Sequence, residues 1–201
     1  MRQTTLRKIA AVVSAVFQPV FVPLYVLMLW WMVVPVAFLS EYTIFCSICM
    51  ATFTFLLPGV VHLILYFTHQ ISDFFISNPK ERNLIYMVSI VCTLLGFLML
   101  NYMECWPLTS FLLASLLALF VVWIINHFWK ISAHMAAWSC MVGCVYLFEL
   151  ETHRLDVECI ILLVLIGGLL GWSRVEQRAH TLAQVLCGAL LGVAASLVML
   201  I

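Results

Sequence analysis

Long apolar runs recur along the whole chain and are separated by short polar segments. Most runs hold about twenty residues, which is the length that a helix needs to cross the hydrocarbon core of a bilayer. The apolar residues follow one another without alternation, so the pattern favours helices over a transmembrane β-barrel. We therefore expect an all-α fold, a polytopic membrane bundle of about six to seven transmembrane helices. Residues 1–201 are expected to form a single integral membrane domain.

The runs also predict where the spans begin and end. Residues 1–16 carry basic side chains beside apolar ones, which is typical of an interfacial helix that lies on the membrane surface. Pro19 and Pro23 indicate a bend before the first span. The expected spans cover residues 19–39, 43–67, 84–101, 107–125, 136–147 and 157–172, and a last one that begins near His180 and ends at Ile201.

Counting these spans places three polar segments on the same membrane face as the N-terminus. The segments are 68–83, 126–135 and 173–184. We expect them to converge, and one missed or added span would separate them again. The opposite face holds most of the carboxylates and one arginine, namely Glu41, Glu104, Glu149, Glu151, Asp156 and Arg154.

Composition narrows the class of protein further. Hydrophobic residues make up 66% of the chain and charged residues only 9%, which excludes a soluble globular domain. The formal net charge of zero gives no electrostatic basis for a nucleic-acid partner. Most of the eight cysteines fall inside apolar runs and only Cys105 lies in an expected loop, so we expect no redox or metal site.

Two of the converging segments carry a histidine beside a helix start. Ser132 is expected to cap the fifth span, with His134 in its first turn. Gln184 lies four residues after His180 on the same helical face, and Arg174 precedes both. Each segment alone is typical of a charged interfacial loop. Together they suit phosphoryl transfer without a metal or cofactor, because one neutral imidazole can attack phosphorus while a protonated one donates to the leaving oxygen.

These residues resemble the signatures of the type 2 phosphatidic acid phosphatase (PAP2) superfamily. Ser173-Arg174-x5-His180 resembles the third signature, SRx5Hx3D, and ISAH at 131–134 resembles the second, PSGH. The segment 78–83, which contains Arg82, stands where the first, Kx6RP, is expected. The similarity covers residues 73–192 and is that of a divergent member with degenerate first and second motifs.

The resemblance implies a membrane-embedded phosphatase that hydrolyses a lipid phosphate or diphosphate through a phosphohistidine intermediate. It implies that His180 is the nucleophile, that His134 is the acid for the leaving group, and that Arg174 is also catalytic. The partner would be a membrane lipid with a phosphate headgroup, and the location a bacterial inner membrane. The implied phosphate-binding residues are Ser132, Arg82, Lys80, Lys130 and Ser173, and Gln184 would orient the nucleophile.

Three departures from the signatures keep other hypotheses open. Gln184 stands in place of an aspartate, Phe75 in place of a lysine, and Asn83 in place of a proline. Glutamine can orient a histidine but adds no negative charge. The alternative is therefore a catalytically weak or inactive PAP2-like protein that binds anionic lipid headgroups. A third hypothesis is a transporter with a proton path through His62, His134 and His180, although no internal repeat supports it.

A stripe of small residues predicts how the last span packs. Gly188-x3-Gly192 is expected to let this helix approach a neighbour in the bundle closely, and contact between copies in a homo-oligomer is the alternative use.

Overall fold

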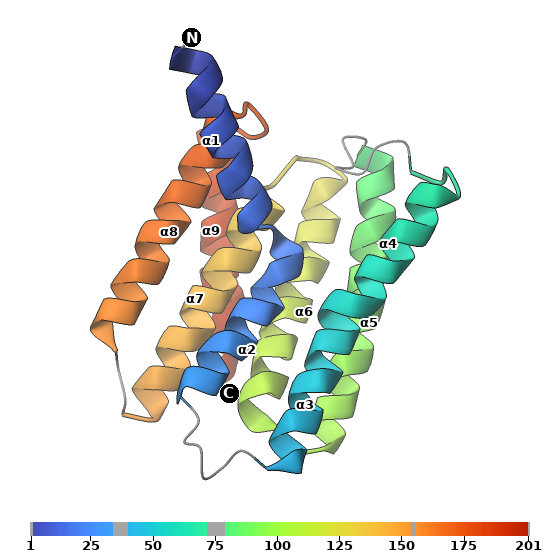
Figure 1. The fold of residues 1–201 in the computed structure, drawn as a ribbon, viewed down its shortest axis with the longest axis vertical. Helices are drawn as coiled ribbons and strands as arrows, with labels where there is room; N and C mark the ends of the chain where they lie inside the picture. The colour runs from blue at the N-terminus through green and yellow to red at the C-terminus, as the bar shows by residue number, and fades with distance from the viewer. Residues whose placement is uncertain (1, 34–39, 72–78, 154–155, 201) are drawn as a thin grey trace.

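The computed structural model describes residues 2–33, 40–71, 79–153 and 156–200. Every regular element in these ranges is helical, which confirms the expected all-α fold. The helices lie side by side in one bundle (Figure 1). In chain order the elements are α1 (Arg2–Val16), a 3-10 turn (Pro19–Phe21), α2 (Val22–Val33), α3 (Glu41–Ala51), a π-helical turn (Thr52–Leu56), α4 (Leu57–Phe67), α5 (Pro79–Tyr102), α6 (Trp106–Asn126), α7 (Ala133–Glu151), α8 (Val157–Glu176), α9 (Leu182–Ser196) and a 3-10 turn (Leu197–Leu200).

Within the described ranges, 7 helical stretches are long and apolar enough to cross a membrane. This number agrees with the predicted spans, and the protein is a multi-pass integral membrane protein. The stretches are Thr5–Met32, Glu41–Phe67, Glu81–Tyr102, Trp106–Asn126, Ala133–Glu151, Val157–Glu176 and Leu182–Leu200.

The N-terminal region differs from the expected arrangement. The first apolar stretch begins at Thr5 rather than near residue 19, because α1 leads through a single 3-10 turn into α2. Residues 34–39 of the expected span lie outside the described ranges. Helix α1 packs against α8 (Figure 1), and Nε2 of Gln177 donates to the carbonyl oxygen of Ala10 at 3.0 Å. The surface position of residues 1–16 stays a prediction, but α1 is clearly a packed part of the bundle.

Two helices run further than the hydropathy pattern predicts. Helix α8 continues past Trp172 to Glu176, so Ser173 and Arg174 lie in its last turns and not in a loop. Helix α7 continues to Glu151, so Glu149 is a buried helical residue and not part of a charged turn. Hydropathy marks only the apolar part of a helix, whereas backbone groups still need hydrogen-bond partners as the chain enters the interface.

Residues in the left-handed conformation follow four of the helices. The residues are His69, Glu104, His153 and Arg178, with φ values of 57°, 58°, 54° and 55°. Each is the second residue after the end of its helix, which is α4, α5, α7 and α8 in turn. One left-handed residue turns the chain out of a helix and lets following N–H groups satisfy its last carbonyls. None of the four is glycine, so the sequence gives little warning of these helix ends.

Helices α7 and α9 form the closest pair in the bundle. A Cβ atom added to Gly188 would lie 2.5 Å from the carbonyl oxygen of Ser132, and one added to Gly192 would lie 2.3 Å from that of Ala136. Such an approach is open only to glycine, which confirms that the small-residue stripe packs within the bundle. The seam places the start of α9 beside the start of α7.

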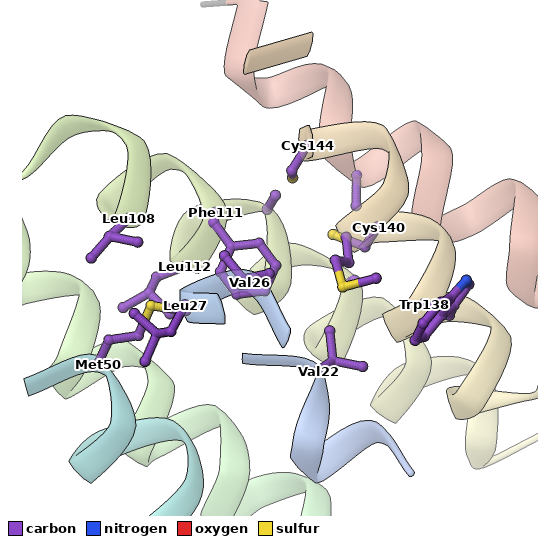
Figure 2. Packing of buried hydrophobic residues seen from close by; sticks show 14 of the residues in the cluster. Val22, Val26, Leu27, Met50, Leu108, Phe111, Leu112, Trp138, Cys140 and Cys144 are labelled. Atoms are coloured by element: carbon purple, nitrogen blue, oxygen red, sulfur yellow. The ribbon is translucent and has the colours of Figure 1, made fainter. Parts of the chain in front are cut away.

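The apolar core fills the space between α2, α3, α6 and α7 (Figure 2). Trp138 lies in α7, and its Nε1 donates to the carbonyl oxygen of Leu163 in α8 at 3.0 Å. The Trp138 ring packs against Phe17 and Tyr25 from the N-terminal part of the chain. These contacts hold α7 in the middle of the bundle, where it can carry one side of a site.

Candidate functional site

The start of α5, the α6–α7 connection, the α8–α9 connection and helix α1 lie at one end of the bundle (Figure 1). We call it the basic end, and define it by Arg82 in the first turn of α5, Lys130 between α6 and α7, and Arg174 near the end of α8. Arg82 and Arg174 both lie within electrostatic range of Lys130 and of Tyr86. The expected convergence of the three polar segments is therefore observed, with residues 72–78 outside the described ranges.

His180 is held by two hydrogen bonds to one ring nitrogen. Its Nδ1 lies 3.1 Å from the carbonyl oxygen of Lys130 and 3.2 Å from Oε1 of Gln184. The same Oε1 accepts from the backbone N–H of Thr181 at 3.1 Å, so both partners of Nδ1 are acceptors. Nδ1 therefore donates, and Nε2 of the neutral ring carries the lone pair.

The surroundings of His180 keep its imidazole neutral. The residue is 9% exposed, and this burial, followed by the nearby Arg174 guanidinium, lowers the pKa of His180 to about 4. Both causes disfavour the imidazolium form. The ring is consequently neutral at all pH values well above 4, which is the state that a nitrogen nucleophile requires.

Local sequence sets the position of His180 just before α9. Arg178 turns the chain out of α8, and the N–H of His180 then donates to the carbonyl oxygen of Arg174 at 3.3 Å. Thr181 is the N-cap of α9 and forms a reciprocal capping box with Gln184. His180 thus lies directly before the N-cap of α9, near the start of the last span as predicted.

His134 lies in the first turn of α7, as predicted, and reaches helix α1. Its Nε2 is 3.4 Å from Oγ of Ser14, and the same Oγ accepts a hydrogen bond from Nη1 of Arg174. His134 also lies within electrostatic range of His180. Two histidines and one arginine that are far apart in the sequence therefore form one cluster.

Several buried polar atoms of this cluster lack a hydrogen-bond partner in the described part of the chain. They are Nε of Arg174, Nε of Arg82 and Oγ of Ser132. Ser132 is fully buried and occupies the N-cap position of α7, but its hydroxyl makes no capping hydrogen bond, contrary to the prediction. The backbone N–H of Ser132 donates to the carbonyl oxygen of Gln184 at 3.3 Å. Because buried polar groups are normally paired, these three donors are candidates for contact with an acceptor-rich ligand.

Other predicted phosphate-binding residues contribute less. The Ser173 hydroxyl donates to the carbonyl oxygen of Leu170 at 2.7 Å, so its proton is engaged inside α8. The Lys130 side chain is exposed, and partial burial followed by repulsion from the two arginines lowers its pKa. The side chain of Lys80 lies outside the described part of the structure.

Three residues at the basic end were not predicted as site residues. Tyr86 follows Arg82 by one helical turn, a spacing that could have been noticed. Asn83 accepts from Nδ2 of Asn126 at 2.6 Å and so ties the starts of α5 and the α6–α7 connection together. Ser14 is a small hydroxyl in an apolar helix, and nothing in the sequence distinguishes it from a packing residue.

The fold and the basic end together define the class of protein. It is a multi-pass helical membrane protein with a cluster of histidine and arginine at one boundary of the bundle. No group of three or more His, Cys, Asp or Glu side chains in the described ranges could hold a metal ion. No protein-family model, no characterised protein and no solved structure matches the chain. The PAP2 resemblance accordingly stays a prediction that depends on the motifs.

Proposed function

We propose that the protein is a membrane-embedded phosphatase that hydrolyses a lipid phosphate or diphosphate through a phosphohistidine intermediate. The observation that carries this proposal is the set of buried donors without described partners beside two histidines: Nε of Arg174, Nε of Arg82 and Oγ of Ser132. A phosphate group offers oxygens to all three, with charge-assisted hydrogen bonds from the two guanidinium groups. A headgroup without acceptor oxygens would leave these donors unsatisfied, at a cost of about 1–3 kcal/mol each.

The proposed reaction divides the work between the two histidines. Nε2 of His180 attacks phosphorus while the bond from phosphorus to the leaving oxygen breaks, and protonated His134 gives its proton to that oxygen. Water then attacks the phosphohistidine, the phosphorus–nitrogen bond breaks, and His134 takes the proton from that water. Arg174 and Arg82 stabilise the negative charge on the oxygens that do not react. The reaction regenerates neutral His180 and requires no metal or cofactor.

Gln184 determines how fast this reaction can be. Its Oε1 accepts from Nδ1 of His180, so it orients the ring. It supplies no negative charge to balance the positive charge that His180 gains on bonding to phosphorus. Replacing the orienting aspartate by its amide lowers the turnover of a serine protease by about four orders of magnitude. We therefore expect slow turnover, and we expect Gln184→Glu to raise kcat by roughly tenfold or more because it adds the charge at similar length.

The proposed substrate is an amphiphile in a bacterial inner membrane. Its tail would stay in the lipid while its phosphate reaches the basic end at the boundary of the bundle. The positive-inside rule favours a cytoplasmic basic end. Most basic residues at this end belong to the proposed site, so they are not independent evidence for the membrane orientation. Independent evidence comes only from three N-terminal residues: Arg2, Arg7 and Lys8.

Phosphate release from a panel of lipid monophosphates and diphosphates by the purified full chain tests the proposal. We expect His180→Ala to lower kcat by at least about a thousandfold, since it removes the nucleophile. His127→Ala is the matched control, because His127 is exposed and bonds only to its own helix, 2.8 Å from the carbonyl oxygen of Trp123. Hydrolysis that survives in His180→Ala at the wild-type rate would contradict the proposed nucleophile.

The second candidate function is binding of anionic lipid headgroups without hydrolysis. Gln184 in place of an acidic residue favours it, since the buried donors would bind phosphate whether or not the nucleophile is activated. This candidate predicts no phosphate release from any lipid of the panel. It also predicts that Arg174→Ala weakens binding to vesicles that contain phosphatidic acid.

A further inference from the structure

Helix α1 places a hydroxyl group inside the candidate site. Ser14 is 6% exposed, and its Oγ lies between Nη1 of Arg174 and Nε2 of His134. Arginine only donates hydrogen bonds, so Oγ accepts from Arg174, and Nε2 of His134 lies 3.4 Å from the same oxygen. The hydroxyl thus bridges the two groups that a bound phosphate has to contact.

The proposed reaction uses both groups that the hydroxyl contacts. Arg174 holds the oxygens that do not react, and His134 gives a proton to the leaving oxygen. Ser14 in this position therefore keeps a phosphate from contacting both groups at once.

The position of Ser14 is supported by its helix. Ala10 lies one turn earlier on α1 and is fully buried, and its carbonyl oxygen accepts from Nε2 of Gln177 on the α8 side of the site at 3.0 Å. This hydrogen bond holds the same face of α1 against α8 on which Ser14 approaches Arg174. Phosphate can enter if the Ser14 side chain rotates away or if the end of α1 moves.

We propose that Ser14 is a positioning residue that occupies the place of one phosphate oxygen beside Arg174 and is displaced when a phosphate headgroup binds. This inference rests on the proposed function, because it assumes that Arg174 and His134 bind phosphate. Two oxygen atoms cannot occupy the same point between the guanidinium and imidazole groups. Ser14 therefore competes with the ligand, and helix α1 closes the site against ligands too weak to displace the hydroxyl.

Binding of inorganic phosphate to the purified full chain in detergent, measured by titration calorimetry, tests the competition. We expect Ser14→Ala to bind phosphate about five- to tenfold more tightly, because a hydrogen bond to a charged group no longer has to break. Ser14→Thr keeps the hydroxyl and should bind like wild type. Ser196→Ala is the matched control, since Ser196 is a buried serine at the far end of α9 that donates only to its own helix, to the carbonyl oxygen of Val193 at 2.7 Å.

The outcomes separate this inference from the proposed function. If wild type binds phosphate and Arg174→Gln does not, the anion site stands, and equal or weaker binding by Ser14→Ala then overturns the role of Ser14. If neither wild type nor Ser14→Ala binds phosphate, the anion site fails and the inference fails with it. Should Ser14→Ala not fold, the nearly isosteric Ser14→Cys replaces it, and its weaker hydrogen bonds should also give tighter binding than wild type.

Discussion

Arg174 and Glu149 are two charged side chains withdrawn from solvent at opposite ends of the bundle, and the protein treats them differently. Glu149 is 4% exposed and its Oε2 accepts from the backbone N–H of Asp156 at 3.1 Å. Asp156 in turn caps α8, with Oδ1 accepting from the N–H of Cys159 at 3.0 Å. At the basic end, Nε of Arg174 and Oγ of Ser132 are buried and have no partner within the described residues.

This contrast separates polar groups that build the fold from those that we propose to bind a ligand. The carboxylates close the α7–α8 connection, and their acceptors are used by backbone donors that would otherwise be unpaired. The donors of the basic end have no partner within the described residues, whereas buried polar groups are normally paired. Burial of charge alone does not distinguish Glu149 from Arg174, whereas the hydrogen-bond partners of the two side chains do.

The strongest test of this contrast neutralises one charge at each end. Arg174→Gln is expected to lower kcat/KM for a lipid phosphate by between about a hundredfold and a thousandfold, because it removes a donor that stabilises transition-state charge. Glu149→Gln should leave kcat/KM unchanged and lower the free energy of unfolding by roughly 1 kcal/mol, since a weaker acceptor faces Asp156. Equal losses of activity in both variants would remove the functional distinction between the ends.

A second test uses the depressed pKa of His180. The ring is neutral when folded, with a pKa of about 4, but gains a proton near pH 6.5 when unfolded. The neutral, buried ring therefore costs no stability above pH 6.5. The free energy of unfolding decreases as the pH falls toward 4, and this loss reaches roughly 2–3 kcal/mol at pH 4.5.

Thermal unfolding in detergent between pH 4.5 and 7.5 measures this loss. His180→Asn should show a shallower decline of the unfolding midpoint than wild type. His69→Asn is the control, because His69 is exposed and asparagine tolerates its positive φ. An identical decline in all three proteins would show that His180 is not buried in the neutral state.

The smallest expected effect concerns the seam that positions Ser132. Gly188→Ala would place a Cβ 2.5 Å from the Ser132 carbonyl oxygen, and we expect it to reduce stability by about 1–3 kcal/mol as α9 moves away from α7. Gly168→Ala has no atom within 4 Å of its new Cβ and should be neutral or stabilising by up to about 1 kcal/mol. Activity should fall in Gly188→Ala only. A fall in both variants would show that activity does not depend specifically on the contact between α7 and α9.

The sequence predicted the helical class well because hydropathy is a local property. Spans four and six were placed within a few residues, and the side-counting argument brought Arg82, Lys130 and Arg174 to one end as observed. Prediction from hydropathy failed where helices continue into polar sequence, as at Arg174, and where a hydroxyl lies in an apolar helix, as at Ser14. Polarity cannot show whether a backbone remains helical, or which of many serines faces a guanidinium group.

The amino-acid order by itself determined that the chain crosses a membrane several times and that its basic residues gather on one face, because the bilayer imposes length and apolarity on each span separately. Tertiary structure decided which polar atoms are satisfied. Only packing of α1 on α8 and of α9 on α7 brings Ser14 to Arg174 and His134, and leaves Ser132 buried without a described partner. Hydrogen bonds between helices depend on their rotation and register, and in this chain those were set by glycine contacts and helix ends that hydropathy does not record.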